Sequence, residues 1–345
     1  MSARRLVPWG STASRWELRG LVVVGVLLLL AYLVAALLFA RSTGNRGLTI
    51  DADAPPGGVV LGLEVVSIDT QTASARGRMH LDVSPELTDD AGQLTESITV
   101  IAILAGKSEW VFPKGQRPGV VDVQLYLDGA VEDYPLDRWV TLFGGLAFPS
   151  STDEDGVAGE PLPTAVAVES SLPGWVTREM TLDEFFDTVP GTSVEGPIST
   201  VGLRFSRAGS TLAIVFLVLA LMVVLAVLGM VVAVAVARGR RRIEPTLTGF
   251  LAALLFALIP LRTVLPGAPP LGAWIDMLVF FWVEILLMTA LALYVATWLS
   301  KGPRPDRPAA GADAADPVAV PDDGTASPAE VSADAVSADA DGGGP

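Results

Sequence analysis

An uninterrupted run of uncharged residues, 212–237, constrains this chain more than any other feature of its sequence. The run is 26 residues long, whereas a helix of about 20 residues is enough to cross the hydrocarbon core of a bilayer. Four arginines follow within residues 238–242, and positive clusters next to a span stay in the cytoplasm. The sequence therefore predicts a membrane helix at 210–237 whose carboxyl end is cytoplasmic, with the residues before it on the other side.

A second uncharged run, residues 21–40, follows an amino-terminal segment, residues 1–20, that holds four arginines and one glutamate. This charge bias predicts a cytoplasmic amino terminus and a first transmembrane helix at 21–40. A cleavable signal peptide is the alternative, but its apolar region usually has only about 7–15 residues and ends in small residues. Because Phe39 is bulky, we favour an uncleaved signal anchor.

Two more apolar segments, 247–265 and 271–299, are joined by a proline-rich link at 266–270. The link is too short to cross a membrane. The segments therefore predict two transmembrane helices that form a hairpin, with an outer turn at 266–270 and a cytoplasmic loop at 238–246. With this topology every cluster of positive charge lies on the cytoplasmic side, which supports the assignment.

Residues 41–209 alternate apolar and polar side chains and are punctuated by Gly, Pro, Asp and Ser, a pattern typical of β structure. They predict an extracytoplasmic, sandwich-like all-β domain, and the four transmembrane helices make the fold class an α+β membrane protein. A short helical turn at 183–187, after a threonine cap and with Phe185 and Phe186 inward, is also expected. The candidate strands are 59–68, 75–83, 97–104, 120–127, 138–146, 165–170, 175–180 and 198–205.

Charge and composition exclude several functions. The formal net charge is −15, and residues 42–209 hold 25 acidic and 10 basic residues, so we expect no nucleic-acid partner. The chain has no cysteine and a single histidine, His80, so it has few of the residues from which the common nucleophilic catalytic sites are built. We therefore expect neither enzymatic activity nor a cofactor. The acidic residues at 89–90 and 153–156 lack the spaced oxygen ligands of a calcium loop, so no metal site is expected.

The last segment, residues 300–345, is an acidic cytoplasmic tail in this topology. From residue 302 onward it has no aromatic residue, and it holds nine acidic residues and two arginines. Such a composition buries too little apolar surface to offset the entropy lost on ordering, so the tail is predicted to be disordered. We favour a solvated spacer over a partner-binding tail.

Three charged residues interrupt the predicted hairpin: Arg262, Asp276 and Glu284. Arg262 and Asp276 lie near the outer ends of adjacent helices, so we expect an ion pair that joins the hairpin. Glu284 lies about 12 Å deeper at about 1.5 Å per residue, and we expect it to face the bundle, protonated or hydrogen-bonded. Its role is then helix adhesion through a hydrogen bond or, alternatively, proton or cation handling.

Small residues recur every four positions on the 212–237 helix, at Gly229, Ala233 and Ala237. Such a stripe allows the backbones of two membrane helices to approach closely. We therefore expect these residues to form a helix-packing face.

The string Tyr134-Pro135-Leu136-Asp137-Arg138 is the most distinctive in the β domain. Proline fixes φ, the tyrosine offers a ring and a hydroxyl, and Asp137 is expected to accept hydrogen bonds from backbone amides at the start of a strand. We interpret the string as a corner between two strands; contact with a ligand is the alternative.

Together with the preceding residues 122–129, DVQLYLDG, this string resembles a bacterial family of multi-pass membrane proteins of unknown function. The resemblance covers about residues 20–300 and implies one span, an extracytoplasmic β domain with a Tyr-Pro-x-Asp turn, and three further spans. It implies an architecture and no activity. A fainter similarity is to pentameric ligand-gated channels, which also have such a turn, but this chain has three later spans where they have four, and it has no cysteine pair.

These observations favour a non-catalytic membrane protein whose outer domain binds an envelope component or a partner protein. Its expected partners are the lipid bilayer and either an envelope protein or a second copy of the chain. The alternative is a receptor or transporter in which the outer domain controls ion or proton movement through the helix bundle. Substitutions at Arg262 and Glu284, compared with substitutions at 134–138, discriminate between these functions.

The topology makes a direct prediction. A reporter fused near Gly129 is expected outside the cytoplasm, because residues 41–209 follow a span with a basic amino-terminal flank and precede one with a basic carboxyl-terminal flank. Activity of a reporter that works only in the cytoplasm, fused at the same position, would invert the orientation.

Overall fold

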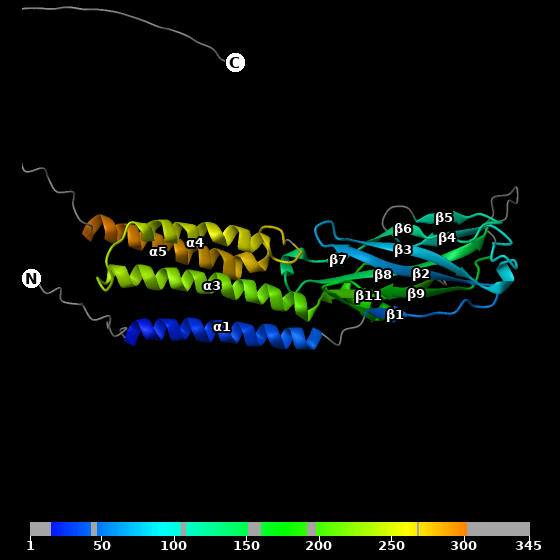
Figure 1. Ribbon diagram of the computed structural model, residues 1–345. Coiled ribbons are helices and arrows are strands. Elements are labelled where there is room, and N and C mark those ends of the chain that lie inside the picture. The colour runs from blue at the N-terminus through cyan, green and yellow to red at the C-terminus, as the bar shows by residue number, and fades with distance from the viewer. Residues whose placement is uncertain are drawn as a thin grey trace, which may run out of the picture. The chain divides into compact units, whose positions relative to one another are not determined.

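The computed structural model describes residues 15–42, 47–104, 108–150, 160–191, 198–267 and 269–301. The predictions for residues 1–14, for the acidic loop at 153–156 and for the tail beyond Lys301 lie outside these described residues. One long helix, α1 (Arg15–Ser42), precedes a β domain, and three long helices follow it (Figure 1).

The first sheet of the β domain contains both parallel and antiparallel pairs. Its strands lie in the order β1-β9-β2-β3-β6. β2 and β9 run parallel, and the other neighbouring strands run antiparallel. The bounds are β1 (Leu48–Ile50), β2 (Val59–Asp69), β3 (Ser74–Val83), β6 (Val121–Tyr126) and β9 (Thr164–Ser170).

The second sheet is antiparallel and lies in the order β10-β11-β8-β4-β5, with the short strand β7 also paired to β8. The bounds are β4 (Ile98–Ala102), β5 (Glu109–Phe112), β7 (Asp128–Gly129), β8 (Arg138–Pro149), β10 (Trp175–Met180) and β11 (Ser199–Arg207).

One apolar core lies between the two sheets. It combines Leu61 and Leu63 of β2 with Phe143 of β8 and with Leu203 and Phe205 of β11, all buried. The members of each strand are two or four residues apart, because successive side chains point to opposite faces of a sheet. The predicted α+β class, with an all-β sandwich-like domain, is confirmed.

Every predicted strand overlaps an observed one, whereas β1, β5 and β7 were not predicted. These three strands have only three, four and two residues, too few for a period of two to be visible in the sequence. The predicted helical turn is α2 (Leu182–Thr188), and the hydroxyl of Thr181 accepts a hydrogen bond from the backbone amide of Glu184 at 3.3 Å. Phe185 is buried, and Phe186 is half-buried and contacts it edge-on.

Among the described residues, four helices are long and apolar enough to cross a membrane, at Val22–Arg41, Gly209–Ala237, Thr246–Thr263 and Asp276–Lys301. The last three correspond to α3 (Gly209–Ala237), α4 (Thr246–Thr263), and α5 (Phe281–Lys301) with the π-helical turn Asp276–Phe280 before it. The segment predicted as helical from residue 271 begins with a turn, in which Gly272 has a φ of +96°.

Helix α3 packs against α4 and α5 through a regular set of small and apolar residues. Met222, Ala226, Gly229, Ala233 and Val236 are buried, and their alternating spacing of four and three residues is the spacing of helices packed side by side. A Cβ atom added at Gly229 would lie 2.7 Å from Cδ2 of Leu287 in α5, so any larger residue would force the buried Leu287 side chain to shift.

The other two residues of the predicted small stripe differ from each other. Ala233 is fully buried and packs in a cluster that contains Leu251 of α4 and Tyr294 of α5. Ala237 is half-buried, and its carbonyl accepts a hydrogen bond from Nζ of Lys301 at 3.0 Å. The stripe therefore faces α4 and α5 and ends at a polar contact.

Replacing Gly229 with leucine is expected to destabilise the helix bundle by about 1–3 kcal/mol, because the new side chain overlaps the fully buried Leu287. Thermal unfolding of the full chain in detergent measures the effect. Gly249→Leu is the matched control, since Gly249 is exposed on α4 and has no atom within 4 Å of an added Cβ. Equal melting temperatures for the two variants would contradict the packing described for α3.

Candidate functional site

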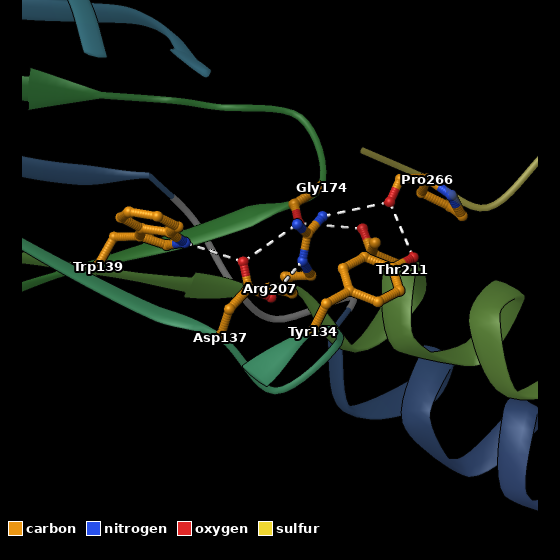
Figure 2. Close-up of polar contacts among 7 residues, drawn as sticks. All are labelled: Tyr134, Asp137, Trp139, Gly174, Arg207, Thr211 and Pro266. Atoms are coloured by element: carbon orange, nitrogen blue, oxygen red, sulfur yellow. Dashed lines mark hydrogen bonds and ion pairs between the residues drawn. The ribbon is translucent and has the colours of Figure 1, made fainter. Parts of the chain in front are cut away.

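Arg207 and Asp137 form a buried ion pair where the β domain meets the helices. Nε of Arg207 lies 2.6 Å from Oδ1 of Asp137, and Nη2 lies 3.1 Å from Oδ2. The side chains are only 4% and 0% exposed. Arg207 is the last residue of β11, two positions before α3 begins, and Asp137 directly precedes β8 (Figure 2). The pair is bidentate, which is the strongest geometry for a guanidinium and a carboxylate.

Asp137 also accepts a hydrogen bond from the indole Nε1 of Trp139, at 2.9 Å. Trp139 is two residues further along the strand, so both side chains point to the core face. The prediction that Asp137 accepts backbone amides is wrong: its described partners are the side chains of Arg207 and Trp139. The two carboxylate oxygens accept three hydrogen bonds, which compensates for burial of the charge.

The guanidinium of Arg207 lies over two aromatic rings. Its Cζ atom is 4.6 Å from the ring centroid of Tyr134 and 4.7 Å from that of Trp175. Both distances are within the range of cation–π attraction, which strengthens when the cation is desolvated. The arginine is therefore held by a carboxylate and by two aromatic rings.

The carbonyl of Pro266, in the link between α4 and α5, accepts hydrogen bonds from the β domain. The hydroxyl of Tyr134 donates to it at 2.9 Å, and Nη1 of Arg207 donates at 3.4 Å. The peptide bond between Tyr134 and Pro135 is cis. Burial raises the pKa of the Tyr134 hydroxyl to about 12, against an opposing effect of the Arg207 charge, so the hydroxyl remains a donor at neutral pH. We call Tyr134, Asp137, Trp139, Trp175, Arg207 and Pro266 the junction network.

Two glycines allow this close approach. A Cβ atom at Gly267, whose φ is +82°, would lie 2.7 Å from Nη1 of Arg207. The carbonyl of Gly174, in the loop before β10, accepts a hydrogen bond from the hydroxyl of Thr211 at 3.0 Å (Figure 2). It also accepts one from the backbone amide of Ala208 at 2.8 Å. The start of α3, directly after Arg207, is thus bound to the β domain through one carbonyl.

A second ion pair organises the link that Pro266 belongs to. Nε and Nη2 of Arg262 each lie 2.8 Å from an oxygen of Asp276, and Asp276 is 1% exposed. Nη2 also donates to the carbonyls of Pro269 and Pro270, and the amide of Gly272 donates to Asp276. The contact expected from the hairpin geometry is present, and it fixes both ends of the link between α4 and α5.

Glu284 does not bond to a neighbouring helix. Its side chain is half-buried and has no hydrogen-bond or ion-pair partner within the described ranges. The expected adhesive hydrogen bond is therefore not found there. Arg262, the cation considered as a partner for Glu284, is paired with Asp276.

The remaining candidates are peripheral. Nε2 of His80 lies 3.6 Å from Oδ2 of Asp82, and both side chains are exposed. Asp89 accepts hydrogen bonds from the backbone amides of Ala91 and Gln93, so it stabilises a turn. In the part of the chain that the structure describes, no group of three or more His, Cys, Asp or Glu residues is placed to hold a metal ion.

The comparisons with known proteins divide the chain close to the junction network. Residues 49–184 match a domain of unknown function (DUF4436), and residues 207–301 match another domain of unknown function (DUF8686). The first match contains Tyr134 and Asp137, and the second begins at Arg207 and contains Pro266. The ion pair therefore joins two separately recognised domains. No curated protein gives a significant match.

Replacing Tyr134 with phenylalanine is expected to destabilise the full chain by about 1 kcal/mol, because the Pro266 carbonyl loses its shorter hydrogen bond. The ring that packs on Arg207 is retained. Tyr126→Phe, which removes a hydroxyl from a side chain that is 73% exposed, is the matched control and is expected to leave the melting temperature unchanged. A Tyr134→Phe protein as stable as the Tyr126→Phe protein would show that the hydroxyl does not stabilise the junction.

Proposed function

We propose that the chain is a multi-pass protein of the cell membrane whose β domain lies outside the cytoplasm and binds an envelope component or a partner protein without catalysis. Both chain ends are cytoplasmic in this proposal. Four apolar helices support the membrane part, and the arginines at 238–242 and Lys301 support the orientation.

The junction network is the observation that carries the proposal. A buried bidentate pair and the Pro266 carbonyl connect the β domain to α3 and to the link between α4 and α5. A domain joined only by a flexible linker has no defined orientation to the membrane. Here the β domain is held at a fixed position on its helices, as suits a displayed recognition surface.

A groove of about 570 Å³ in the β domain is a suitable surface for a partner. Val66, Arg76, Arg78, Trp110 and Gln124 contribute to its lining. Trp110 lies on β5 and Gln124 on β6, and each of these strands is the last in its sheet. Edge strands have unpaired backbone groups that other chains can pair with, and aromatic and arginine side chains are enriched at protein interfaces.

A receptor or transporter remains the second candidate, because Tyr134 and Arg207 connect the β domain to the hairpin through one carbonyl. A displacement of the β domain would reach α4 and α5 by this route. The buried cluster in the middle of α3, α4 and α5 is apolar, however, and contains Met222, Leu258 and Leu287. This cluster offers no polar path for an ion, so we favour binding.

A photoreactive amino acid at Gln124 tests the proposal in intact cells. It is expected to give a discrete covalent adduct that is lost when Arg76 and Arg78 are replaced by glutamate, because both line the same groove. The control is the same amino acid at Asp187, which is exposed on α2 and lies outside the groove. Absence of an adduct at Gln124, together with an ion flux lost in Glu284→Gln at normal protein level, would favour the transporter.

A further inference from the structure

Arginines gather on the outer face of the second sheet, at its end nearest α3. Arg178 of β10 lies directly opposite Arg204 of β11, and Arg138 of β8 lies directly opposite Ser206 of β11. Positions 204 and 206 are two residues apart on one strand, so all four side chains share one face. Like charges directly opposite each other destabilise a sheet. In a domain with a large excess of acidic residues, this arrangement needs an explanation beyond folding.

Neighbouring carboxylates neutralise only part of this charge. Arg204 pairs with Glu184 at 2.8 Å. Arg138 and Arg178 are exposed, and neither has an ion-pair or hydrogen-bond partner among the residues that the structure describes. These two guanidiniums are available to an anion.

The arginines line a cavity of about 380 Å³ that also reaches the membrane helices. Arg138, Arg178, Arg204 and Ser206 contribute to its wall, and Leu212 of α3 lies at its boundary. An arginine guanidinium can donate two parallel hydrogen bonds to phosphate oxygens, and a serine hydroxyl supplies a further donor. The cavity therefore has the chemistry of a phosphate site next to a membrane helix.

A second, larger cavity of about 580 Å³ adjoins the first. Pro135, Leu136 and Arg138 line both cavities. The walls of the second cavity are largely apolar and include Phe216 and Leu219 of α3. Because these two residues lie four and seven positions after Leu212, all three share one face of the helix. The two cavities together form a groove that runs from the arginines along α3.

Large apolar side chains that line the second cavity are exposed. Leu136 is 65% exposed, Trp274 is 57% exposed and Leu278 is 67% exposed. Tryptophan is enriched where a membrane meets water, since its ring is apolar and its N–H is polar. The groove is therefore cationic in its first cavity, at the arginines, and apolar in its second cavity, along α3. This arrangement is complementary to a molecule with a phosphate and a hydrocarbon chain.

We propose that this groove is a binding site for an anionic phospholipid. The phosphate binds Arg138 and Arg178, with Ser206 as a further donor, and an acyl chain lies along Phe216, Leu219 and Leu278. Free phosphate would leave the apolar half of the groove empty, and charge complementarity selects an anionic headgroup over a zwitterionic one. Since Arg207 of the junction network lines the first, arginine-lined cavity, the lipid contacts the β domain and α3 at the point where they are joined.

The test is native mass spectrometry of the full chain, released from nanodiscs that contain equal amounts of phosphatidylglycerol and phosphatidylcholine. The unmodified protein is expected to retain phosphatidylglycerol in preference. Arg138→Gln with Arg178→Gln is expected to lower that preference about tenfold, since each arginine near a membrane contributes to anionic-lipid binding. Leu136→Asp, which puts a carboxylate between the two cavities at an exposed position, is expected to do the same.

Lys114→Gln with Arg117→Gln is the matched control, because it removes two positive charges from exposed positions outside both cavities. This control is expected to retain the lipid preference. Equal retention of the two lipids by the unmodified protein would overturn the proposal. Loss of the lipid preference in the control would also overturn it, and so would displacement of the lipid by a 10-fold excess of inorganic phosphate. A third contradicting result would be a dimer of the chain that dissociates when Arg138 and Arg178 are substituted, while the bound lipid stays the same.

Discussion

The buried pair of Arg207 and Asp137 is the interaction on which the remaining structure depends. Taking both charges out of water is costly, and the cost is offset only if every donor and acceptor finds a partner. Here the carboxylate also accepts a hydrogen bond from Trp139, and the guanidinium lies over the rings of Tyr134 and Trp175. Because these partners come from different strands and loops, the pair forms only when the sandwich is complete and α3 continues from β11.

A second ion pair extends this order into the helices. Arg262 and Asp276 hold the link between α4 and α5, so the Pro266 carbonyl is presented to Tyr134 and Arg207 in a defined position. The close contact of Gly229 with Leu287 places α5 against α3. Two ion pairs and one glycine contact therefore connect the β domain, the link and the helix bundle in series. Both the proposed display of the β domain and the proposed lipid site beside it depend on this connection.

Features with a local pattern could be predicted from the sequence. Uncharged runs indicated the helices, alternation indicated the longer strands, and the short link between two charged helix ends indicated the contact of Arg262 with Asp276. The pairing of Asp137 with Arg207 could not be predicted, because the two residues lie 70 positions apart in the sequence. From the sequence alone, Arg207 resembles any basic residue that flanks an apolar helix. The arginine groove was missed for the same reason: Arg138, Arg178 and Arg204 meet only through strand register.

A double-mutant cycle on Asp137 and Arg207, measured by equilibrium unfolding of the full chain in mixed micelles, tests the central role of the pair most directly. Asp137→Leu and Arg207→Met alone each leave one buried charge without its partner, which costs about 3–5 kcal/mol. The double variant leaves neither charge, so the account predicts a loss much smaller than the sum of the two single losses. Additive losses would mean that the two residues act independently and that the β domain is held on its helices by other contacts.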